Sequence, residues 1–354
     1  MSGKAAFRLF LTKGIVPLTY DDTYPGPVDL SQVDRIILSP GFTLNHTIVV
    51  AAQERGIPIQ SEIDFALEHI RGKFVIGITG SNGKSTMVKQ IEHVLNYYGI
   101  RAEALGNVEV PLSSAIVDPP DVFVIELSAQ QLETTHQKVL DLGVILNVQP
   151  NHLDRYQTME NYKQAKLRIF DLVKEGGEKL GPEVSSELVF EKIGEKFFLK
   201  KGEITSALAS YKNLPHRLEY LGDFFGKKIY NDSKSTTFSS TLYALKKVAG
   251  PIQLIFGGRS KGEDLGAFVE ELKTIPLKRV LAIGETMEEI RQALEPSVEV
   301  ILCTTLEKAV QEGIKGEGNL LLSPGFASYD QFHSYAHRGD TFKQRIEWEK
   351  KMLS

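Results

Sequence analysis

The chain has 354 residues, enough for two or three domains, and its contents of 42% hydrophobic and 24% charged residues are ordinary for a soluble globular enzyme. Its formal net charge of −4 gives no electrostatic case for binding nucleic acid or an anionic membrane. No apolar run approaches the roughly 20 residues of a membrane span, and we expect no secretory leader.

Residues 1–72 are expected to form a first α/β domain. The runs IVPLTY (15–20) and RIILSP (35–40) have the pattern of buried strands, and EIDFALEHIRG (62–72) has that of a helix ending at a glycine. Polar and turn-forming residues follow both strands, where ligands bind in open α/β sheets. They are Asp21 and Asp22, with Thr23, after the first strand, and Ser39, Pro40 and Gly41 after the second.

A second domain, residues 73–213, begins with the strand–loop–helix pattern of a phosphate-binding loop. FVIGIT (74–79) predicts a buried strand, STMVKQIEHVL (85–95) a helix, and GSNGKS (80–85) lies between them. The early glycine of a Walker A loop is replaced by Ile78. Glycines can still turn backbone N–H groups toward phosphates, and the helix N-terminus adds partial positive charge. The expected nucleotide-binding residues are Gly80, Ser81, Asn82, Gly83, Lys84, Ser85 and Thr86.

Candidate metal and substrate residues follow the next strands. Glu126 ends the strand-like run 122–127, which suits a Mg²⁺ carboxylate. His152 follows the run 144–148, where it is either a site residue or a loop histidine that caps a helix. The polar, glycine-rich stretch 174–187 predicts a loop or a shortened excursion of the chain.

A third domain, residues 214–354, alternates strand-like and helical patterns. Strands are expected at 252–258, 279–284, 298–303 and 319–325, with a helix at 238–250. This alternation indicates parallel α/β sheets throughout the chain. Cys303, the only cysteine, lies in an apolar strand-like run, so we expect it to be buried and the protein to be cytoplasmic.

The phosphate loop resembles the T-G-x-x-G-K-S/T loop of the Mur ligase superfamily, which lacks the early Walker glycine. Further motifs appear in family order: ELSAQQLE (126–133), NHLDRY (151–156), AKLRIF (165–170), LPHRLE (214–219), NDSKST (231–236) and LLSPGFASYDQF (321–332). The resemblance implies three domains: a Rossmann-like first domain, a P-loop ATPase domain and a Rossmann-like third domain. The pattern is most similar to the members that join D-glutamate to UDP-N-acetylmuramoyl-L-alanine through an acyl phosphate. It implies ATP and Mg²⁺ as cofactors, and we expect a monomer.

The resemblance also assigns roles. Lys84, Asn107, Glu126, His152 and Lys166 would be catalytic. Lys166 would be a carbamate that binds Mg²⁺ with Ser85, Glu126 and His152, although its helical pattern alone favours a solvated lysine. Arg217, Asp232 and Lys234 would bind ATP, although NDSK also suits a turn with an aspartate cap. The implied substrate residues are Asp21, Asp22, Ser39, Pro40, Gly41, Asn107, Ser128, Gln131, Thr236, Lys261, Ser328, Tyr329 and Tyr335, the last usually phenylalanine in the family.

Two departures from the family pattern bear on activity. The family usually opens with a strand and a G-x-G turn, whereas Ser2 and Gly3 match only the end of that turn, so we expect the first strand to be missing. Only 50 residues separate Lys166 from Arg217, and the family's adenine-contacting helix motif is absent from them. The alternative is therefore an ATP-binding, Mur-like protein with weak or no ligase activity.

Other activities are less well supported. Related ligases add L-alanine, a diamino acid, or glutamate to folate, but the pocket around Lys261 and Ser328 matches the D-glutamate pattern. A dinucleotide oxidoreductase is disfavoured because no complete G-x-G-x-x-G follows a strand.

Overall fold

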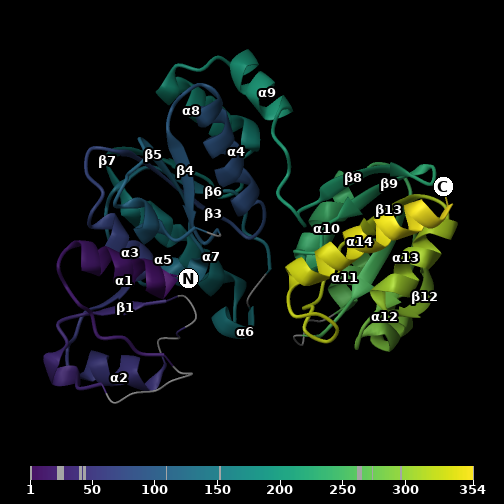
Figure 1. Ribbon diagram of the computed structural model, residues 1–354, viewed down its shortest axis with the longest axis horizontal. Helices are drawn as coiled ribbons and strands as arrows, with labels where there is room; N and C mark the ends of the chain where they lie inside the picture. The colour runs from purple at the N-terminus through teal and green to yellow at the C-terminus, as the bar shows by residue number, and fades with distance from the viewer. Residues whose placement is uncertain are drawn as a thin grey trace. The chain divides into compact units, whose positions relative to one another are not determined.

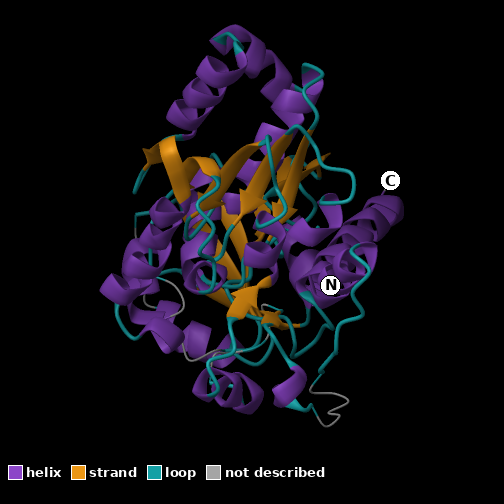
Figure 2. Ribbon diagram, turned by 90° about the vertical axis from the view of Figure 1, so that its left-hand side faces the viewer, coloured by secondary structure: helices purple, strands orange, loops and turns teal. Residues whose placement is uncertain are grey.

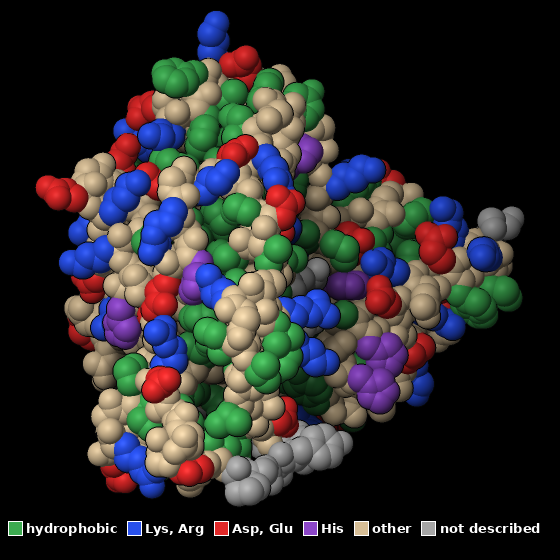
Figure 3. All heavy atoms as spheres, turned by 60° about the vertical axis from the view of Figure 1, so that its left-hand side comes forward, with side chains coloured by type: hydrophobic (Ala, Val, Ile, Leu, Met, Phe, Trp, Pro, Cys, Tyr) green, Lys and Arg blue, Asp and Glu red, His purple; other side chains and the backbone are tan. Residues whose placement is uncertain are grey.

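The computed structural model describes residues 2–21, 28–39, 42, 45–108, 110–150, 153–260, 265–272, 274–295 and 297–353. The chain forms two compact units, Met1–Tyr211 and Lys212–Ser354, each with helices packed on parallel β-strands (Figure 1). Among the residues just given, no helix combines the length and the apolar character that crossing a membrane requires. On the face drawn in Figure 3, acidic and basic side chains are interspersed, so this face carries no large region of a single charge.

The main sheet of the first unit has five parallel strands in the order β4-β5-β3-β6-β7. They are β3 (Phe74–Thr79), β4 (Ala102–Gly106), β5 (Val122–Glu126), β6 (Leu140–Ile145) and β7 (Val173–Leu180). Helices lie on both faces, as Figure 2 shows. Ile76 and Ile78 face α4 (Lys84–Tyr97), whereas Val75 faces α3 (Glu62–Leu67). Alternate residues of a strand point to opposite faces, so a wholly apolar strand is buried on both.

A smaller sheet of the first unit pairs β1 (Ile36–Leu38) with β2 (Ile59–Ser61) in parallel. The helices near it are α1 (Ser2–Thr12) and α2 (Thr47–Glu54), and Phe10 of α1 stacks on Phe65 of α3 at 4.4 Å between ring centroids. The expected strand at 15–20 is wrong. Its residues pair with no strand in the described part of the chain, and Val16 is 81% exposed, so the segment lacks the hydrogen-bonding partner that a strand needs. The expected lack of the family's first strand stays a prediction.

The segment predicted to be a loop, 174–187, contains most of β7, so that prediction is also wrong. β7 is an edge strand that pairs with β6, and most of its side chains face solvent. An edge strand with solvent-exposed side chains does not need alternating apolar and polar residues, because backbone hydrogen bonds to its neighbour hold it in the sheet. After β7, helices α8 (Ser186–Phe197) and α9 (Lys201–Ala209) pack on α4 through Val189, Ile193 and Ile204. The shortened segment between Lys166 and Arg217 therefore still supplies helices that cover α4.

The remaining short elements of the first unit connect these layers. They are η1 (Leu30–Gln32), η2 (Leu112–Ala115), α5 (Ala129–Glu133), α6 (Leu153–Tyr156), α7 (Met159–Leu167) and η3 (Arg168–Leu172).

The second unit contains a six-stranded sheet in the order β12-β11-β10-β13-β9-β8, parallel except for β8. The strands are β8 (Glu219–Phe224), β9 (Lys227–Asn231), β10 (Ile252–Gly257), β11 (Leu277–Ile283), β12 (Glu299–Thr304) and β13 (Asn319–Leu322). One face is covered by α10 (Phe238–Lys247), α11 (Leu265–Leu272) and α12 (Met287–Leu294), the other by α13 (Leu306–Lys315) and α14 (Tyr335–Leu353). Cys303 is 2% exposed in β12, which confirms the prediction that it is buried in a strand.

Candidate active site

The phosphate loop lies between β3 and α4, as predicted. Gly83 is the N-terminal cap of α4 with φ of +83°, a left-handed conformation that favours glycine. The Lys84 ammonium group folds back over the loop and donates to the carbonyl oxygens of Gly80, at 2.7 Å, and Ser81, at 3.0 Å. Ser81 and Asn82 are buried, and Thr86 lies in the first turn of α4. The loop thus presents a helix N-terminus and a cation in one place, which suits a phosphate group.

Hydrogen bonds join three of the predicted residues, Ser85, Asn107 and Glu126. Glu126 is 2% exposed and lies at the end of β5. The Ser85 hydroxyl donates to Glu126 Oε2 at 2.5 Å, and the Asn107 amide donates to Oε1 at 2.9 Å. Glu126 pairs with Ile78 in the sheet register, so parallel pairing brings the carboxylate to the edge where the phosphate loop begins. The arrangement offers oxygen ligands beside a phosphate-binding loop.

Lys166 is not a solvated lysine, and the interpretation from its helical pattern alone is wrong. Its side chain is 1% exposed, and Nζ donates to the Gly80 carbonyl at 2.8 Å and lies 4.5 Å from the ring centroid of Tyr162. Burial, together with the nearby charge of Lys84, lowers the pKa of Lys166 to about 6, although Glu126 opposes this shift. A neutral amine can react with carbon dioxide to form a carbamate, whereas an ammonium group cannot.

An open pocket lies between the ends of β1 and β2 and the helices α5 and α6. Ser39, after β1, and Gln131, on α5, line the same pocket, so two predicted substrate residues from distant parts of the sequence come together. Other lining residues include Ser61, Glu62, Glu133 and Arg155, and Arg155 pairs with Glu133 at 2.6 Å.

Ser128 and Gln131 also cap α5. The Ser128 hydroxyl accepts from the Gln131 N–H at 3.2 Å, and Gln131 Oε1 accepts from the Ser128 N–H at 2.9 Å. Asp21 is the last described residue before the gap at 22–27. Six predicted site residues lie outside the described residues: Asp22, Thr23, Pro40, Gly41, His152 and Lys261.

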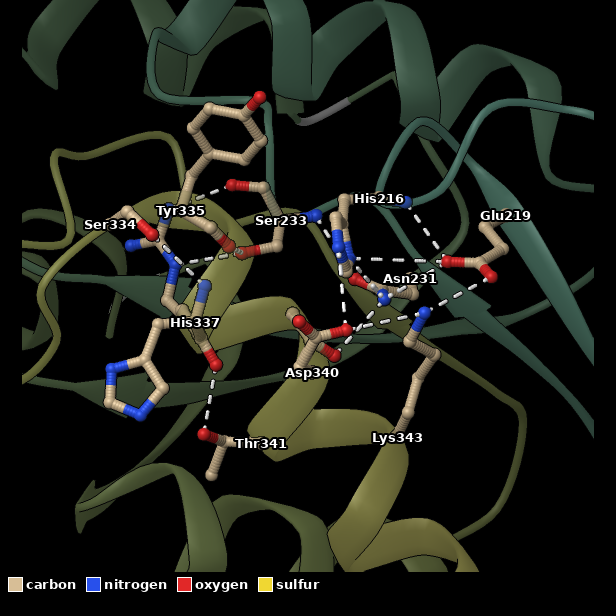
Figure 4. Close-up of polar contacts among 12 residues, drawn as sticks. His216, Glu219, Asn231, Ser233, Ser334, Tyr335, His337, Asp340, Thr341 and Lys343 are labelled. Atoms are coloured by element: carbon tan, nitrogen blue, oxygen red, sulfur yellow. Dashed lines mark hydrogen bonds and ion pairs between the residues drawn. The ribbon is translucent and has the colours of Figure 1, made fainter.

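In the second unit, the predicted nucleotide residues surround the loop after β9. The Lys234 N–H donates to the His216 carbonyl at 3.1 Å, which joins this loop to the segment that carries Arg217. Lys234 Nζ lies 5.0 Å from the ring centroid of Tyr335. Figure 4 shows Tyr335 beside Ser233, whose hydroxyl donates to the Tyr335 carbonyl at 2.8 Å. The loop is therefore fixed on two sides.

The predicted substrate residues of this unit differ in exposure. Ser328 is 3% exposed and Tyr329 is 66% exposed in the loop after β13, and Thr236 lies just before α10. Tyr335 begins α14.

Asp232 is 6% exposed and accepts internal hydrogen bonds from the Leu218 N–H at 2.9 Å and the Ser323 hydroxyl at 2.8 Å. Burial raises the pKa of Asp232 from 3.8 to about 6, although the hydrogen bonds from Ser235, Ser323 and Leu218 oppose this shift.

We expect the stability of the second unit to depend on pH through Asp232. Because its pKa is higher when folded, its contribution is complete below pH 3.8 and is lost as the pH rises through about 6. The free-energy difference of unfolding between wild type and Asp232→Asn should therefore fall by about 2 kcal/mol between pH 4 and pH 7. Urea unfolding measures this difference. The fluorescence of Trp348, the only tryptophan, reports on the second unit because Trp348 lies in α14. If the free energies of unfolding of the two proteins changed equally with pH, the expectation would be refuted.

Sequence reasoning missed several residues that organise the site. His216, 7% exposed, is bonded to the side chain of Asn231 at 3.0 Å and lies next to Asp340 and Glu219 in Figure 4. Its place next to Arg217 in LPHR was the available signal. Asn147 and Gln149, which contact the phosphate loop, carried no signal, because they lie in a loop whose partner is distant in sequence.

Known proteins resemble this chain over most of its length. Residues 78–247 match the family model of the Mur ligase middle domain. The chain is 31% identical over 378 residues to the UDP-N-acetylmuramoylalanine–D-glutamate ligase of Protochlamydia amoebophila, covering 90% of this chain and 85% of that protein. The ligase of the same name from Chlamydia caviae is 35% identical, covering 89% and 84%. The one from Aquifex aeolicus is 31% identical, covering 98% and 96%.

Solved structures share the fold at lower identity. The MurF ligase of Thermotoga maritima in complex with ADP has a TM-score of 0.61 at 16% identity, covering 91% of this chain and 90% of that one. The UDP-N-acetylmuramate-alanine ligase MurC of the same organism has a TM-score of 0.58 at 15% identity, covering 97% and 91%. These likenesses confirm the α/β fold with parallel sheets that the sequence predicted.

Proposed function

Because the chain belongs to the Mur ligase family, among its UDP-N-acetylmuramoylalanine–D-glutamate ligases, we propose that it joins D-glutamate to UDP-N-acetylmuramoyl-L-alanine at the expense of ATP. The product is a precursor of peptidoglycan, and we place the enzyme in the cytoplasm as a monomer. The observation that carries the proposal is the meeting of Ser85, Asn107 and Glu126 beside the phosphate loop. A buried carboxylate and a hydroxyl beside a phosphate-binding loop support this proposal, because phosphoryl transfer depends on metal ions and cations that neutralise charge.

The reaction requires two displacements. First, a carboxylate oxygen of the alanine residue attacks the γ-phosphorus of ATP, the bond to the β-phosphate oxygen breaks, and ADP leaves. Second, the amine of D-glutamate attacks the acyl carbon, phosphate leaves with its bridging oxygen, and the nitrogen loses a proton as the amide forms. In this proposal Lys84 swings from the Gly80 and Ser81 carbonyls to the β- and γ-phosphates, and Asn107 orients the acceptor carboxylate.

The oxygen donors around Glu126 fit Mg²⁺. The Ser85 hydroxyl and the Glu126 carboxylate are hydrogen-bonded to each other at a buried site, and hard oxygen ligands are what this ion prefers. We propose that Ser85, Glu126, His152 and a carbamate on Lys166 hold it. When bound, the ion neutralises charge on the transferring phosphoryl group. Carbamate formation joins the neutral Lys166 amine to carbon dioxide and releases one proton.

The other ligands are assigned by the family pattern. Arg217, Asp232 and Lys234 would bind ATP, although the carboxylate of Asp232 is already used in internal hydrogen bonds. D-Glutamate would contact Thr236, Lys261, Ser328, Tyr329 and Tyr335, a set with a cation and several hydroxyls that suits a dicarboxylic amino acid. The uridine nucleotide would bind the pocket lined by Ser39 and Gln131. The family pattern adds Asp21, Asp22, Pro40 and Gly41 to its contacts.

Phosphate release by the purified chain tests the proposal. We expect release with ATP, Mg²⁺ and UDP-N-acetylmuramoyl-L-alanine to require D-glutamate, and neither L-glutamate nor D-alanine to replace it. Release that is independent of the amino acid, or ATP binding without release, would favour the alternative of a Mur-like protein without ligase activity.

A further inference from the structure

The phosphate loop is held from outside by the segment that follows β6. Ile78 occupies the place of the early Walker glycine and is completely buried, so the loop cannot begin its turn there. The turn begins at Gly80, whose φ is +156° and where an added Cβ would lie 3.1 Å from Leu146 Cβ. The backbones of the loop and of the segment after β6 are therefore in close contact.

Asn147 makes a pair of hydrogen bonds with the backbone of one residue of the loop. Its Oδ1 accepts from the Asn82 N–H at 2.9 Å, and its Nδ2 donates to the Asn82 carbonyl at 3.0 Å. The Asn147 carbonyl also accepts from the Ser81 N–H at 3.0 Å. One half-buried residue thus fixes the backbone of two consecutive loop positions.

Gln149 holds the side chains of the same two positions. The Ser81 hydroxyl donates to the Gln149 carbonyl and accepts from the Gln149 N–H, both at 2.9 Å. The Asn82 amide donates to Gln149 Oε1, also at 2.9 Å. Asn147 and Gln149 together form a brace around residues 80–82.

We infer that Asn147, supported by Gln149, is a positioning residue for ATP: it replaces the missing early glycine by holding the phosphate loop in its binding shape. The inference rests on the proposed function. The brace engages the N–H groups of Ser81 and Asn82, so the phosphates are left to Lys84 and to the first turn of α4, whose N–H groups have no acceptor within the helix. Without the brace, the loop must be ordered when ATP binds, and that cost weakens binding.

The chain provides a matched control. Asn96, near the other end of α4, makes the same pair of hydrogen bonds with a single residue: Nδ2 donates to the Ala102 carbonyl at 2.8 Å, and Oδ1 accepts from the Ala102 N–H at 3.1 Å. In the described part of the chain, the side-chain hydrogen bonds of Asn96 go to Ala102 and not to the phosphate loop. Asn96→Ala therefore removes an equivalent structural contact without removing the brace.

The test compares Asn147→Ala, Asn147→Asp and Asn96→Ala in the full chain, using calorimetric titration with ATP and Mg²⁺ and the KM values for ATP and D-glutamate. We expect Asn147→Ala to weaken ATP binding by about 10- to 100-fold and to raise the KM for ATP, with the KM for D-glutamate unchanged. Asn147→Asp keeps the acceptor for the Asn82 N–H but loses the donor, so its affinity should lie between those of wild type and Asn147→Ala. Asn96→Ala should bind ATP as wild type does.

The outcomes separate this inference from the proposed function. Wild type that binds ATP but shows no D-glutamate-dependent turnover contradicts the proposed function, while the binding comparison still tests the brace. If Asn147→Ala does not fold, Asn147→Asp decides: it keeps the acceptor for the Asn82 N–H and loses the donor to the Asn82 carbonyl, so an ATP affinity equal to that of wild type would overturn the inference. Equal ATP affinity in Asn147→Ala and Asn96→Ala would overturn it as well.

Discussion

Replacing Glu126 by glutamine is expected to lower kcat/KM for D-glutamate-dependent phosphate release by about a thousandfold, which corresponds to about 4 kcal/mol of transition-state stabilisation. The substitution preserves the shape of the side chain and its acceptor oxygen but removes the buried negative charge. It leaves Ser85 and Asn107 with one acceptor between them instead of two. The variant should therefore lose both the carboxylate ligand of the proposed Mg²⁺ site and the hydrogen bond that orients Asn107.

Glu103→Gln is the matched control for Glu126→Gln. Glu103 lies on β4, the strand next to β5, and pairs with Phe123 rather than with the residues at the end of that strand. Its carboxylate is half-buried, and burial raises its pKa. We expect Glu103→Gln to retain activity within a few-fold of wild type. Comparable losses in the two variants would mean that Glu126 acts through folding and not through the site.

The second large effect is expected at Lys166. Lys166→Ala should lose at least about a hundredfold in kcat/KM, because the buried amine contacts the phosphate loop at Gly80 and supplies the carbamate of the proposed metal site. A short-chain carboxylate such as propionate should restore part of the activity by placing an anion in the space that the side chain leaves. Carbon-13 bicarbonate should give a carbamate resonance in wild type that is absent from the variant.

Lys227→Met is the matched control for Lys166→Ala. Lys227 is also buried, and its Nζ donates to the carbonyls of Gly313 at 3.0 Å and Ile314 at 2.7 Å, near the end of α13. Removing it should lower the free energy of unfolding by about 1–3 kcal/mol and leave turnover unchanged. An active Lys166→Ala enzyme without added carboxylate would exclude the carbamate.

Local patterns predicted several strands, the phosphate loop and the position of Glu126, because each depends on its own short stretch of sequence. The strand at 74–79 coincides with β3, and Glu126 lies where the pattern of its strand places it. Lys166 could be assigned only from the family resemblance, since its burial results from contacts with Gly80 and Tyr162 across the fold.

The errors have a common physical origin. The apolar run at 15–20 has the composition of a strand but no strand partner in the described residues, whereas the polar run at 173–180 has an unfavourable composition and a partner in β6. Strand formation depends on backbone pairing between distant segments, and no short window of sequence contains that information. The brace of Asn147 and Gln149 was missed for the same reason.

The most direct test of the central claim uses UDP-N-acetylmuramoyl-L-alanine labelled with oxygen-18 in both oxygens of the alanine carboxylate. During turnover with ATP, Mg²⁺ and D-glutamate, the account predicts that each phosphate released carries one labelled oxygen, because the carboxylate oxygen that attacks the γ-phosphorus leaves with it. Unlabelled phosphate released in step with ATP consumption would mean that water cleaves ATP, and would contradict an acyl-phosphate ligase.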